Sequence, residues 1–193
     1  MMMNYFKVFK EFMTYPSITG AIMPSSNRLS ELITDLADLS DASSVIEFGP
    51  GTGVFTEKIL QKKNKDANFI AIELNAEFVA ATKKRCPNAA VYHDSALNAR
   101  HYLSAHGLQH CDCIVCGLPW ASFSRSLQWE LLGTVVDILK PGGKFVTFAY
   151  LQGLLLPAGL SFRKKIQSGF RKVTTSSPVW MNAPPAFVYC AQK

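Results

Sequence analysis

The chain has 193 residues, of which 48% are hydrophobic and 18% charged, and its formal net charge is +6. This length suffices for one domain with a hydrophobic core, and the absence of a run of about 18 apolar residues excludes a membrane-spanning helix. Five cysteines without a disulfide-type pattern, and a start without the apolar core of a signal peptide, predict a protein of the reducing cytoplasm.

Positive charge is concentrated in the C-terminal part of the chain. Residues 138–193 hold 8 Lys/Arg and no Asp/Glu, whereas residues 1–137 hold 12 Lys/Arg and all 14 acidic residues. A segment of one sign indicates an anionic partner, which is either a membrane surface or a nucleic acid. The alternative is a solvated basic face that has no partner.

The first predicted element is an amphipathic helix over residues 4–15, which a proline ends. Its aromatic side could pack on the rest of the domain or lie in a membrane interface, and the pattern favours neither. A loop over residues 18–27 follows. Ser26 or Asn27 is expected to cap the next helix, over residues 28–39.

The stretch from Val45 to Phe55 predicts a buried strand, a tight turn and the start of a helix that continues over residues 56–62. This unit opens dinucleotide-type α/β folds, and its glycines let a ligand approach the backbone. Glu47 stands before the turn, where a carboxylate would repel a pyrophosphate. A carboxylate suits a positively charged ligand, such as S-adenosylmethionine with its amino group and sulfonium. The alternatives are another nucleotide or no ligand. The turn consists of Gly49, Pro50, Gly51, Thr52 and Gly53.

Two further acidic residues stand at predicted strand ends. Glu73 ends a strand over residues 69–73, at about the distance from the glycine turn at which such an acid binds ribose hydroxyls. Asp94 ends the next apolar segment, where an adenine amino group could be met. Together with the glycine turn, these acids predict an S-adenosylmethionine site. Helices are expected over residues 75–85 and, less regularly, 95–106.

The rest of the chain continues the alternation of strands and helices. It predicts an α/β, Rossmann-like fold, with a mostly parallel sheet, helices on both faces and an antiparallel edge. We expect a single domain over residues 1–193. The predicted elements are strands at 111–115 and 145–150, a helix at 127–139, a turn at 140–144, an apolar segment at 151–162, a basic segment at 163–172, and late strands at 173–175 and 185–190.

A methyl acceptor is expected near Gly117 to Trp120, because ligands of open α/β sheets bind at the carboxyl ends of the strands. Methyl transfer needs close alignment and exclusion of water, for which Pro119 and Trp120 suit a rigid wall. An aromatic face can also hold a methylated ammonium by cation–π attraction. We expect this role for Trp120, and Tyr15, Phe123 and Tyr150 are weaker candidates.

No metal site is expected. The spacing of three cysteines is metal-like, but they fall on a predicted buried strand whose alternate side chains face opposite sides. The histidines between the third and fourth strands have no ligand spacing and are expected on the surface. These residues are Cys111, Cys113, Cys116, His101, His106 and His110.

Five pieces of the sequence together resemble the bacterial phospholipid N-methyltransferases, which methylate phosphatidylethanolamine toward phosphatidylcholine. The resemblance spans nearly the whole chain. The glycine turn is common to class I methyltransferases, whereas the Pro-Ser-Ser, Gly-Leu-Pro and Trp-x-Asn-x-Pro-Pro-Ala pieces are more particular. The pieces are residues 20–26, 47–54, 117–120, 139–145 and 179–186.

The resemblance implies S-adenosylmethionine as cofactor, and a phospholipid headgroup and an anionic membrane surface as partners. Residues 1–27 and the insertion 151–172 would face the membrane of a peripherally associated cytoplasmic enzyme. A phosphodiester needs a cation, for which Arg28 and Arg125 are equal candidates. The cofactor-binding residues would be Glu47, Gly49, Pro50, Gly51, Gly53, Glu73, Leu74, Asp94, Ser95, Gly117 and Leu118. The acceptor side would hold Ser25, Ser26, Arg28, Pro119, Arg125 and Tyr150, with Trp120 and Tyr15 as catalytic candidates.

This family is similar to the ribosomal RNA adenine dimethylases, whose motif after the fourth strand is Asn-Leu-Pro followed by an aromatic residue. Here Gly117 replaces the Asn, which removes the side-chain carbonyl that those enzymes use to hold the adenine amino group. RNA methylation is therefore the alternative function, with nucleic acid the less favoured partner. A non-catalytic membrane-binding protein that retains the fold is a third possibility.

Overall fold

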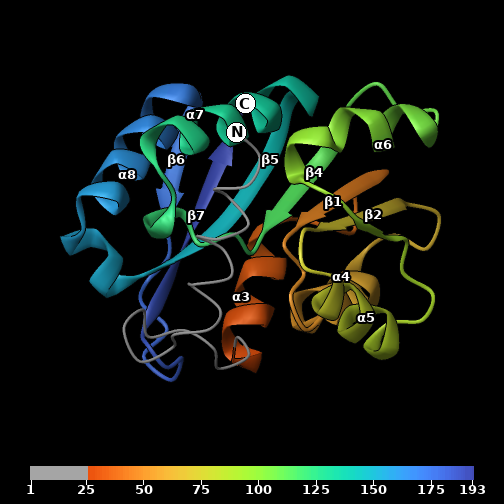
Figure 1. Cartoon of the computed structure of the whole chain (residues 1–193), viewed down its shortest axis with the longest axis horizontal. Helices are drawn as coiled ribbons and strands as arrows, with labels where there is room; N and C mark the ends of the chain where they lie inside the picture. Colours follow the sequence, from red (N-terminus) through yellow and green to blue (C-terminus); the bar gives the residue numbers. More distant parts are fainter. Residues whose placement is uncertain (1–25) are drawn as a thin grey trace.

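The structure is a computed structural model that describes residues 26–193. Tyr15, Ser25 and the helix expected over residues 4–15 lie outside the described residues. The strands are β1 (Ser44–Phe48), β2 (Asn68–Glu73), β3 (Val91–His93), β4 (Cys111–Cys116), β5 (Leu139–Tyr150), β6 (Lys172–Thr175) and β7 (Ala186–Gln192). They form one seven-stranded sheet in the order β3-β2-β1-β4-β5-β7-β6 (Figure 1).

The sheet is parallel from β3 to β5 and antiparallel beyond. β1 pairs in parallel with β2 and β4, and the outer pairs β2–β3 and β4–β5 are parallel as well. β7 runs antiparallel to both β5 and β6. The predicted mostly parallel sheet with an antiparallel edge is therefore confirmed. The carboxyl ends of β1 to β5 all lie along one edge of the sheet.

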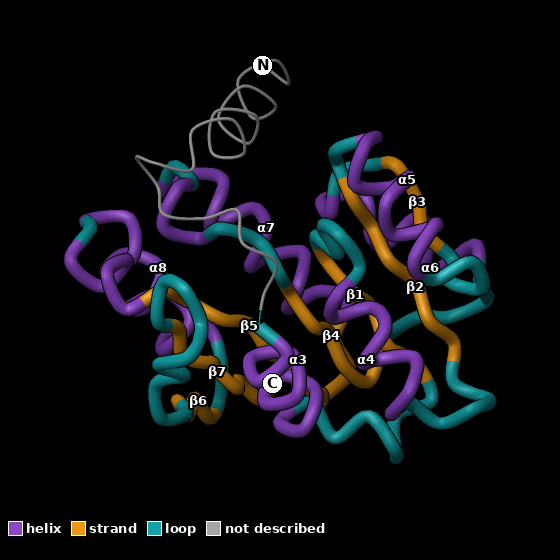
Figure 2. Tube along the Cα trace, turned by 90° about the horizontal axis from the view of Figure 1, so that it is seen from below, coloured by secondary structure: helices purple, strands orange, loops and turns teal. Residues whose placement is uncertain are grey.

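Helices cover both faces of the sheet, and each face has its own hydrophobic core. One core joins α3, α4 and α5 to residues such as Val45 and Val115, and the other joins α6, α7 and α8 to residues such as Ile46 and Ile114. Figure 2 shows α3 beside α4 over the middle of the sheet. The helices are α3 (Asn27–Leu36), α4 (Val54–Lys62), α5 (Ala76–Arg85), α6 (Ala99–Ala105), α7 (Arg125–Ile138) and α8 (Pro157–Gly169), with 3-10 turns η1 (Ala96–Asn98), η2 (Trp120–Ser122) and η3 (Leu151–Leu155).

Polar side chains at the carboxyl edge of the sheet start three of these helices. Ser26 Oγ accepts a hydrogen bond from Leu29 N in α3, Asn75 Oδ1 caps α5, and Ser124 Oγ caps α7. Each cap satisfies backbone N–H groups that have no partner within the helix. The caps therefore fix where each helix leaves the edge at which the candidate site lies.

Two sequence-based expectations on this half of the chain need correction or detail. The turn expected over residues 140–144 lies within β5 (Leu139–Tyr150) as an irregularity of the strand: Cys111 pairs with Leu139 and Cys113 with Lys144, and Gly142 in between has a φ angle of 77°. The three cysteines of β4 are buried as expected, with Cys111 and Cys116 in one core and Cys113 in the other. No helix within residues 26–193 combines the length and apolar character that a bilayer crossing needs.

The segment after β5 is fixed to the domain by packing and by a buried polar network. α8 buries Phe162 and Ile166, and η3 approaches α8 so closely that a Cβ on Gly159 would lie 1.9 Å from the carbonyl oxygen of Gly153. Buried Gln128 of α7 donates to the carbonyls of Trp120 and Ala158 at 2.8 and 2.9 Å. Its Oε1 accepts from Lys165 Nζ of α8 at 3.1 Å. Gln128 thus connects η2, α7 and α8.

Candidate active site

The glycine turn after β1 lies at the centre of the carboxyl edge. Gly49, Gly51 and Gly53 have φ angles of 68°, 59° and 82°, a region that side chains other than glycine rarely adopt. Gly49 N donates to Ile72 O of β2, and Gly53 N donates to Pro50 O. A Cβ on Gly51 would meet no atom within 4 Å, so the backbone at this position is open to a ligand.

Glu47 lies fully buried beneath this turn. Its Oε2 accepts a hydrogen bond from Thr56 Oγ1 of α4 at 2.6 Å, and its Oε1 has no hydrogen-bond partner among residues 26–193. Burial raises the pKa of Glu47 to about 8, while the Thr56 hydrogen bond lowers it and the nearby Glu73 carboxyl raises it. An unsatisfied buried carboxyl oxygen beside a glycine turn fits a ligand that brings positive charge.

Glu73, at the end of β2, is oriented by backbone amides. Its Oε2 accepts from Gly51 N at 3.1 Å and its Oε1 accepts from Asn75 N at 2.9 Å. Burial raises the pKa of Glu73, and its hydrogen bonds to backbone amides oppose that shift. The carboxyl therefore connects the glycine turn to the start of α5, and each oxygen keeps a free lone pair for a ligand hydroxyl.

Asp94, just after β3, is held by three donors. Its Oδ1 accepts from Ser95 N at 2.7 Å and from Asn98 Nδ2 at 2.9 Å, and its Oδ2 accepts from Tyr102 Oη at 2.8 Å. Burial disfavours the charged carboxylate, but these hydrogen bonds outweigh burial and lower the pKa of Asp94. The carboxylate is therefore ionised at neutral pH and accepts hydrogen bonds only.

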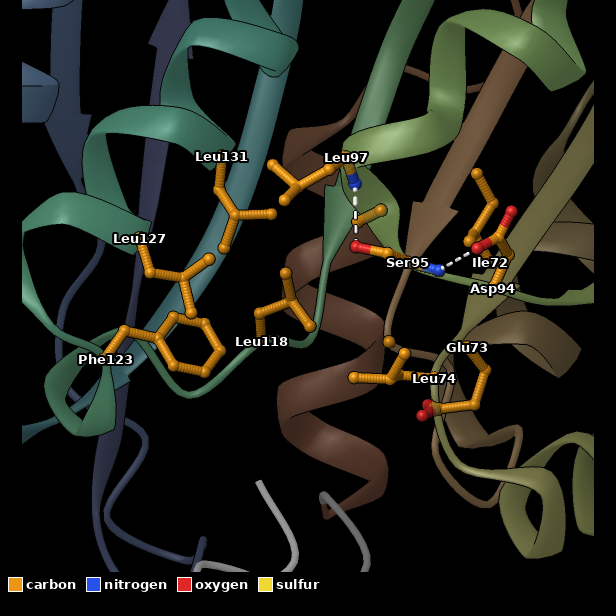
Figure 3. A pocket seen from close by; sticks show the side chains of 12 residues that line it. Ile72, Glu73, Leu74, Asp94, Ser95, Leu97, Leu118, Phe123, Leu127 and Leu131 are labelled. Atoms are coloured by element: carbon orange, nitrogen blue, oxygen red, sulfur yellow. Dashed lines mark hydrogen bonds between the residues drawn. The ribbon is translucent and has the colours of Figure 1, made fainter. Parts of the chain in front are cut away.

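A pocket joins these elements (Figure 3). It holds about 510 Å³ of space, its open mouth included. In Figure 3, Glu73 and Leu74 lie on one side, Asp94 and Ser95 on another, and Leu118 stands between them and the side chains of α7. The lining residues are Gly49, Ile72, Glu73, Leu74, Asp94, Ser95, Ala96, Leu97, Leu118, Phe123, Leu127 and Leu131.

Gly117 brings the end of β4 into contact with the glycine turn. Gly117 N donates to Phe48 O at 2.7 Å, and a Cβ on Gly117 would lie 2.5 Å from the carbonyl oxygen of Gly49. Side chains larger than hydrogen are therefore incompatible with this backbone approach. The glycine that stands where the dimethylases carry asparagine is required by the local packing of this chain.

The structure contradicts the expectation that the face of the Trp120 ring holds a methylated ammonium. The ring is 2% exposed, stacks on Phe162 of α8 at 4.4 Å between ring centroids, and donates Nε1–H to Thr147 Oγ1 at 3.0 Å. Because Phe162 already covers its face, that face is not available to a methylated ammonium. Trp120 instead anchors η2 to the hydrophobic core.

The other residues expected on the acceptor side are only partly brought together. Arg28 and Arg125 are exposed at the first turns of α3 and α7, and neither lines the pocket. Tyr150 is half-buried against Phe148, and burial raises its pKa. Ser26 N donates to Oδ1 of buried Asn182, which fixes the start of α3 to the loop before β7. Pro119 precedes η2 without lining the pocket.

Sequence reasoning missed the apolar side of the pocket. Leu97, Leu127 and Leu131 have no feature in the sequence that separates a pocket wall from a core position. Phe123, one of the aromatic residues expected near the acceptor, lines the pocket with its ring toward Leu127 (Figure 3). Within residues 26–193, no group of three or more His, Cys, Asp or Glu side chains could hold a metal ion.

The sheet order, the glycine turn after β1 and the acids after β2 and β3 define the class of Rossmann-like methyltransferases. The sequence model of a family described as Methyltransferase domain matches residues 45–143, more than half of the chain. The chain belongs to this family and is an S-adenosylmethionine-dependent methyltransferase.

The curated relatives include a lipid methyltransferase and a ribosomal RNA methyltransferase. The chain is 27% identical over 192 residues to an ornithine lipid N-methyltransferase of Singulisphaera acidiphila, which covers 88% of this chain and all of that protein. It is 32% identical over 71 residues to the ribosomal RNA small subunit methyltransferase A of Hydrogenobaculum sp., which covers 37% of this chain and 27% of that protein.

Solved structures agree on the fold. An O-methyltransferase from Bacillus cereus in complex with SAH superposes with a TM-score of 0.70, covering 96% of this chain and 90% of that chain at 10% identity. The predicted Rossmann-like methyltransferase fold is thereby confirmed.

Proposed function

We propose that this enzyme transfers methyl groups from S-adenosylmethionine to the amine of a membrane lipid headgroup, with phosphatidylethanolamine as the first candidate. The ornithine lipid N-methyltransferase, which matches over its whole length, supports a lipid amine as acceptor. Phosphatidylethanolamine and ornithine lipids share the chemistry at issue, an amine on the headgroup of a membrane lipid. The experiment below distinguishes the two.

The buried and open features of the site support the following proposed roles for its residues. When bound, the cofactor supplies a methyl group on a positively charged sulfur. The open backbone at Gly51 receives the amino-acid part, and Glu47 offsets its positive charge from below. Glu73 would accept hydrogen bonds from the ribose hydroxyls, and Asp94 would accept a hydrogen bond from the adenine amino group. Leu74 and Leu118, which both line the pocket, would contact the purine.

The observation that carries the lipid assignment is a group of exposed apolar side chains at the same edge of the sheet. Leu155 is 84% exposed, and Trp180 and Met181 are 70% and 68% exposed. η3 directly follows β5, and Leu151 N donates to Pro185 O in the loop that carries Trp180. Both segments therefore project from the edge that holds the pocket. We call Leu155, Leu156, Leu160, Trp180 and Met181 the apolar rim.

Charge on the neighbouring surface supports a lipid partner. Arg163 and Lys164 of α8 are exposed, follow the rim residue Leu160 on the same helix and belong to the segment without acidic residues. Arg171 and Lys172 are exposed as well, but they lie at the opposite edge of the sheet, where Lys172 pairs with Gln192. Each cation near an anionic leaflet contributes on the order of 1 kcal/mol. Apolar side chains that enter the interface, together with several cations, suffice for reversible membrane binding.

The packing of Gly117 supports a lipid amine over an adenine acceptor. The Asn side chain that the dimethylases use at this position does not fit 2.5 Å from the Gly49 carbonyl. The basic C-terminal segment and the ribosomal RNA methyltransferase relative keep RNA as the alternative acceptor.

The test is transfer of labelled methyl groups from S-adenosylmethionine in parallel reactions. The acceptors are anionic vesicles with phosphatidylethanolamine, anionic vesicles with an ornithine lipid, and structured RNA at physiological salt. We expect label in a lipid fraction, and the labelled lipid identifies the acceptor. Glu73→Ala, which removes the proposed ribose contact, should abolish the signal.

Two outcomes would contradict the proposal. Label in RNA and not in either lipid would assign the enzyme to RNA methylation. Intact binding of S-adenosylmethionine without label in any lipid would exclude these lipids as acceptors. The numbers of methyl groups found per labelled lipid give the extent of the reaction.

A further inference from the structure

Three hydrogen-bond donors hold the Asp94 carboxylate, and they reach both of its oxygens. Two of its three donors, Ser95 N and Asn98 Nδ2, come from the next four residues and both reach Oδ1. Only Tyr102, one turn into α6, donates to Oδ2. The two oxygens rotate together about the Cβ–Cγ bond, so donors on both oxygens hold the carboxylate in one direction more firmly than donors on one, and Tyr102 supplies the donor to Oδ2.

The Tyr102 ring is itself held in place. It packs against Tyr92 of β3 with ring centroids 4.3 Å apart and against His101 at 5.2 Å. Tyr92 supplies a close comparison, because its hydroxyl bonds to His106 Nε2 at 2.8 Å and not to Asp94. Two neighbouring phenols of similar burial therefore have different partners, and only one of them reaches the pocket lining.

We propose that Tyr102 is a positioning residue that orients the Asp94 carboxylate so that the pocket selects a 6-amino purine over a 6-oxo purine. The inference rests on the proposed placement of adenine beside Asp94. An ionised carboxylate accepts a hydrogen bond from an amino group, whereas it repels the carbonyl oxygen of a 6-oxo purine. Discrimination against the carbonyl depends on the carboxylate being held in a fixed direction, because a side chain free to rotate can turn away from it.

The experiment compares the affinities of two ligands by calorimetry, without a methyl acceptor. The ligands are S-adenosylhomocysteine and its 6-oxo analogue S-inosylhomocysteine, and the readout is the ratio of their dissociation constants. In the wild type we expect a preference for the adenine ligand of 100-fold or more, since a site built for an amino group leaves polar groups unpaired with the analogue. Tyr102→Phe should reduce the ratio about tenfold. Asp94→Asn, whose amide can donate to a carbonyl, should abolish or invert it.

Tyr92→Phe is the matched control, since it removes one phenol hydroxyl from the same ring pair and should leave the ratio unchanged. A purely structural role for Tyr102 would weaken the binding of both ligands equally, and an unchanged ratio in folded Tyr102→Phe overturns the proposal.

If Tyr102→Phe does not fold, Asn98→Ala tests the proposal by removing a donor to Oδ1 instead of the donor to Oδ2. Oδ2 stays fixed in that variant, so its ratio should exceed that of Asp94→Asn, and an equal loss contradicts the special role of Oδ2. Failure of the wild type to bind S-adenosylhomocysteine would overturn the cofactor placement itself. Lipid methylation is not involved in any of these measurements.

Discussion

Replacement of Glu47 by Gln should change how the stability of the enzyme depends on pH. Burial raises the pKa of Glu47 from 4.5 to about 8 in the folded, ligand-free state. A raised pKa means that the contribution to stability is complete below about pH 4.5 and is lost as the pH rises through 8. The Gln side chain does not ionise, so the variant does not lose this contribution. The variant should therefore gain stability relative to the wild type as the pH rises from 5 to 8.

The size of the gain follows from the two pKa values. The interval from 4.5 to about 8, at about 1.36 kcal/mol for each pH unit, corresponds to an upper limit of about 5 kcal/mol. The assay is urea unfolding of both proteins at half-unit steps from pH 5 to pH 9, without cofactor. The difference in unfolding free energy should rise by up to 1.4 kcal/mol per pH unit and level off above pH 8. Any loss of packing in the variant adds a constant that does not depend on pH.

Glu77→Gln, an exposed change in the first turn of α5, is the control for removal of a carboxyl group. A difference between wild type and Glu47→Gln that stays constant from pH 5 to pH 8 would refute the reasoning. Such a result would mean that Glu47 is ionised in the free enzyme, for example because backbone amides at the start of α4 stabilise its carboxylate.

Three further changes test the site and its surroundings. Gly117→Ala places a Cβ 2.5 Å from the Gly49 carbonyl and should weaken S-adenosylhomocysteine binding at least tenfold, whereas Gly133→Ala on α7 has open space and should not. Leu155→Asp combined with Trp180→Asp should abolish sedimentation with anionic vesicles while cofactor affinity is kept, and Trp129→Asp, which is exposed outside the apolar rim, is its control. Gly159→Ala forces η3 away from α8 and should lower the unfolding free energy by about 1–3 kcal/mol, as measured by urea unfolding.

The convergence of Glu73, Asp94 and the glycine turn on one pocket was predictable because its signals are local. Glu73 and Asp94 follow short apolar runs, and the sheet places the ends of those runs at one edge whatever the details of packing. The positive φ angles of the turn favour glycine, so the turn can be recognised from the glycines in the sequence. These features depend on a few neighbouring residues and on the parallel order of the strands.

The surroundings of Trp120 and the apolar wall of the pocket were not predictable because residues distant in the sequence determine them. Trp120 looks like a wall after a Gly-Leu-Pro turn, but Phe162 and Thr147 draw its ring into the core. The residues near Trp120 in the sequence do not indicate that it contacts Phe162 or Thr147. Leu127 and Leu131 read as ordinary inward positions of a helix, and only the gap between α7 and η1 makes them part of a pocket.

The buried hydrogen bonds of Gln128 determine how a movement of α8 would affect the turn at η2. Lys165 and Ala158 tie α8 to Gln128, and Gln128 in turn holds the Trp120 carbonyl of η2. Moving the start of α8 away from α7 would break these hydrogen bonds and leave the Gln128 amide without these partners. A displacement of α8 is therefore expected to be coupled to the position of η2, the turn that follows β4.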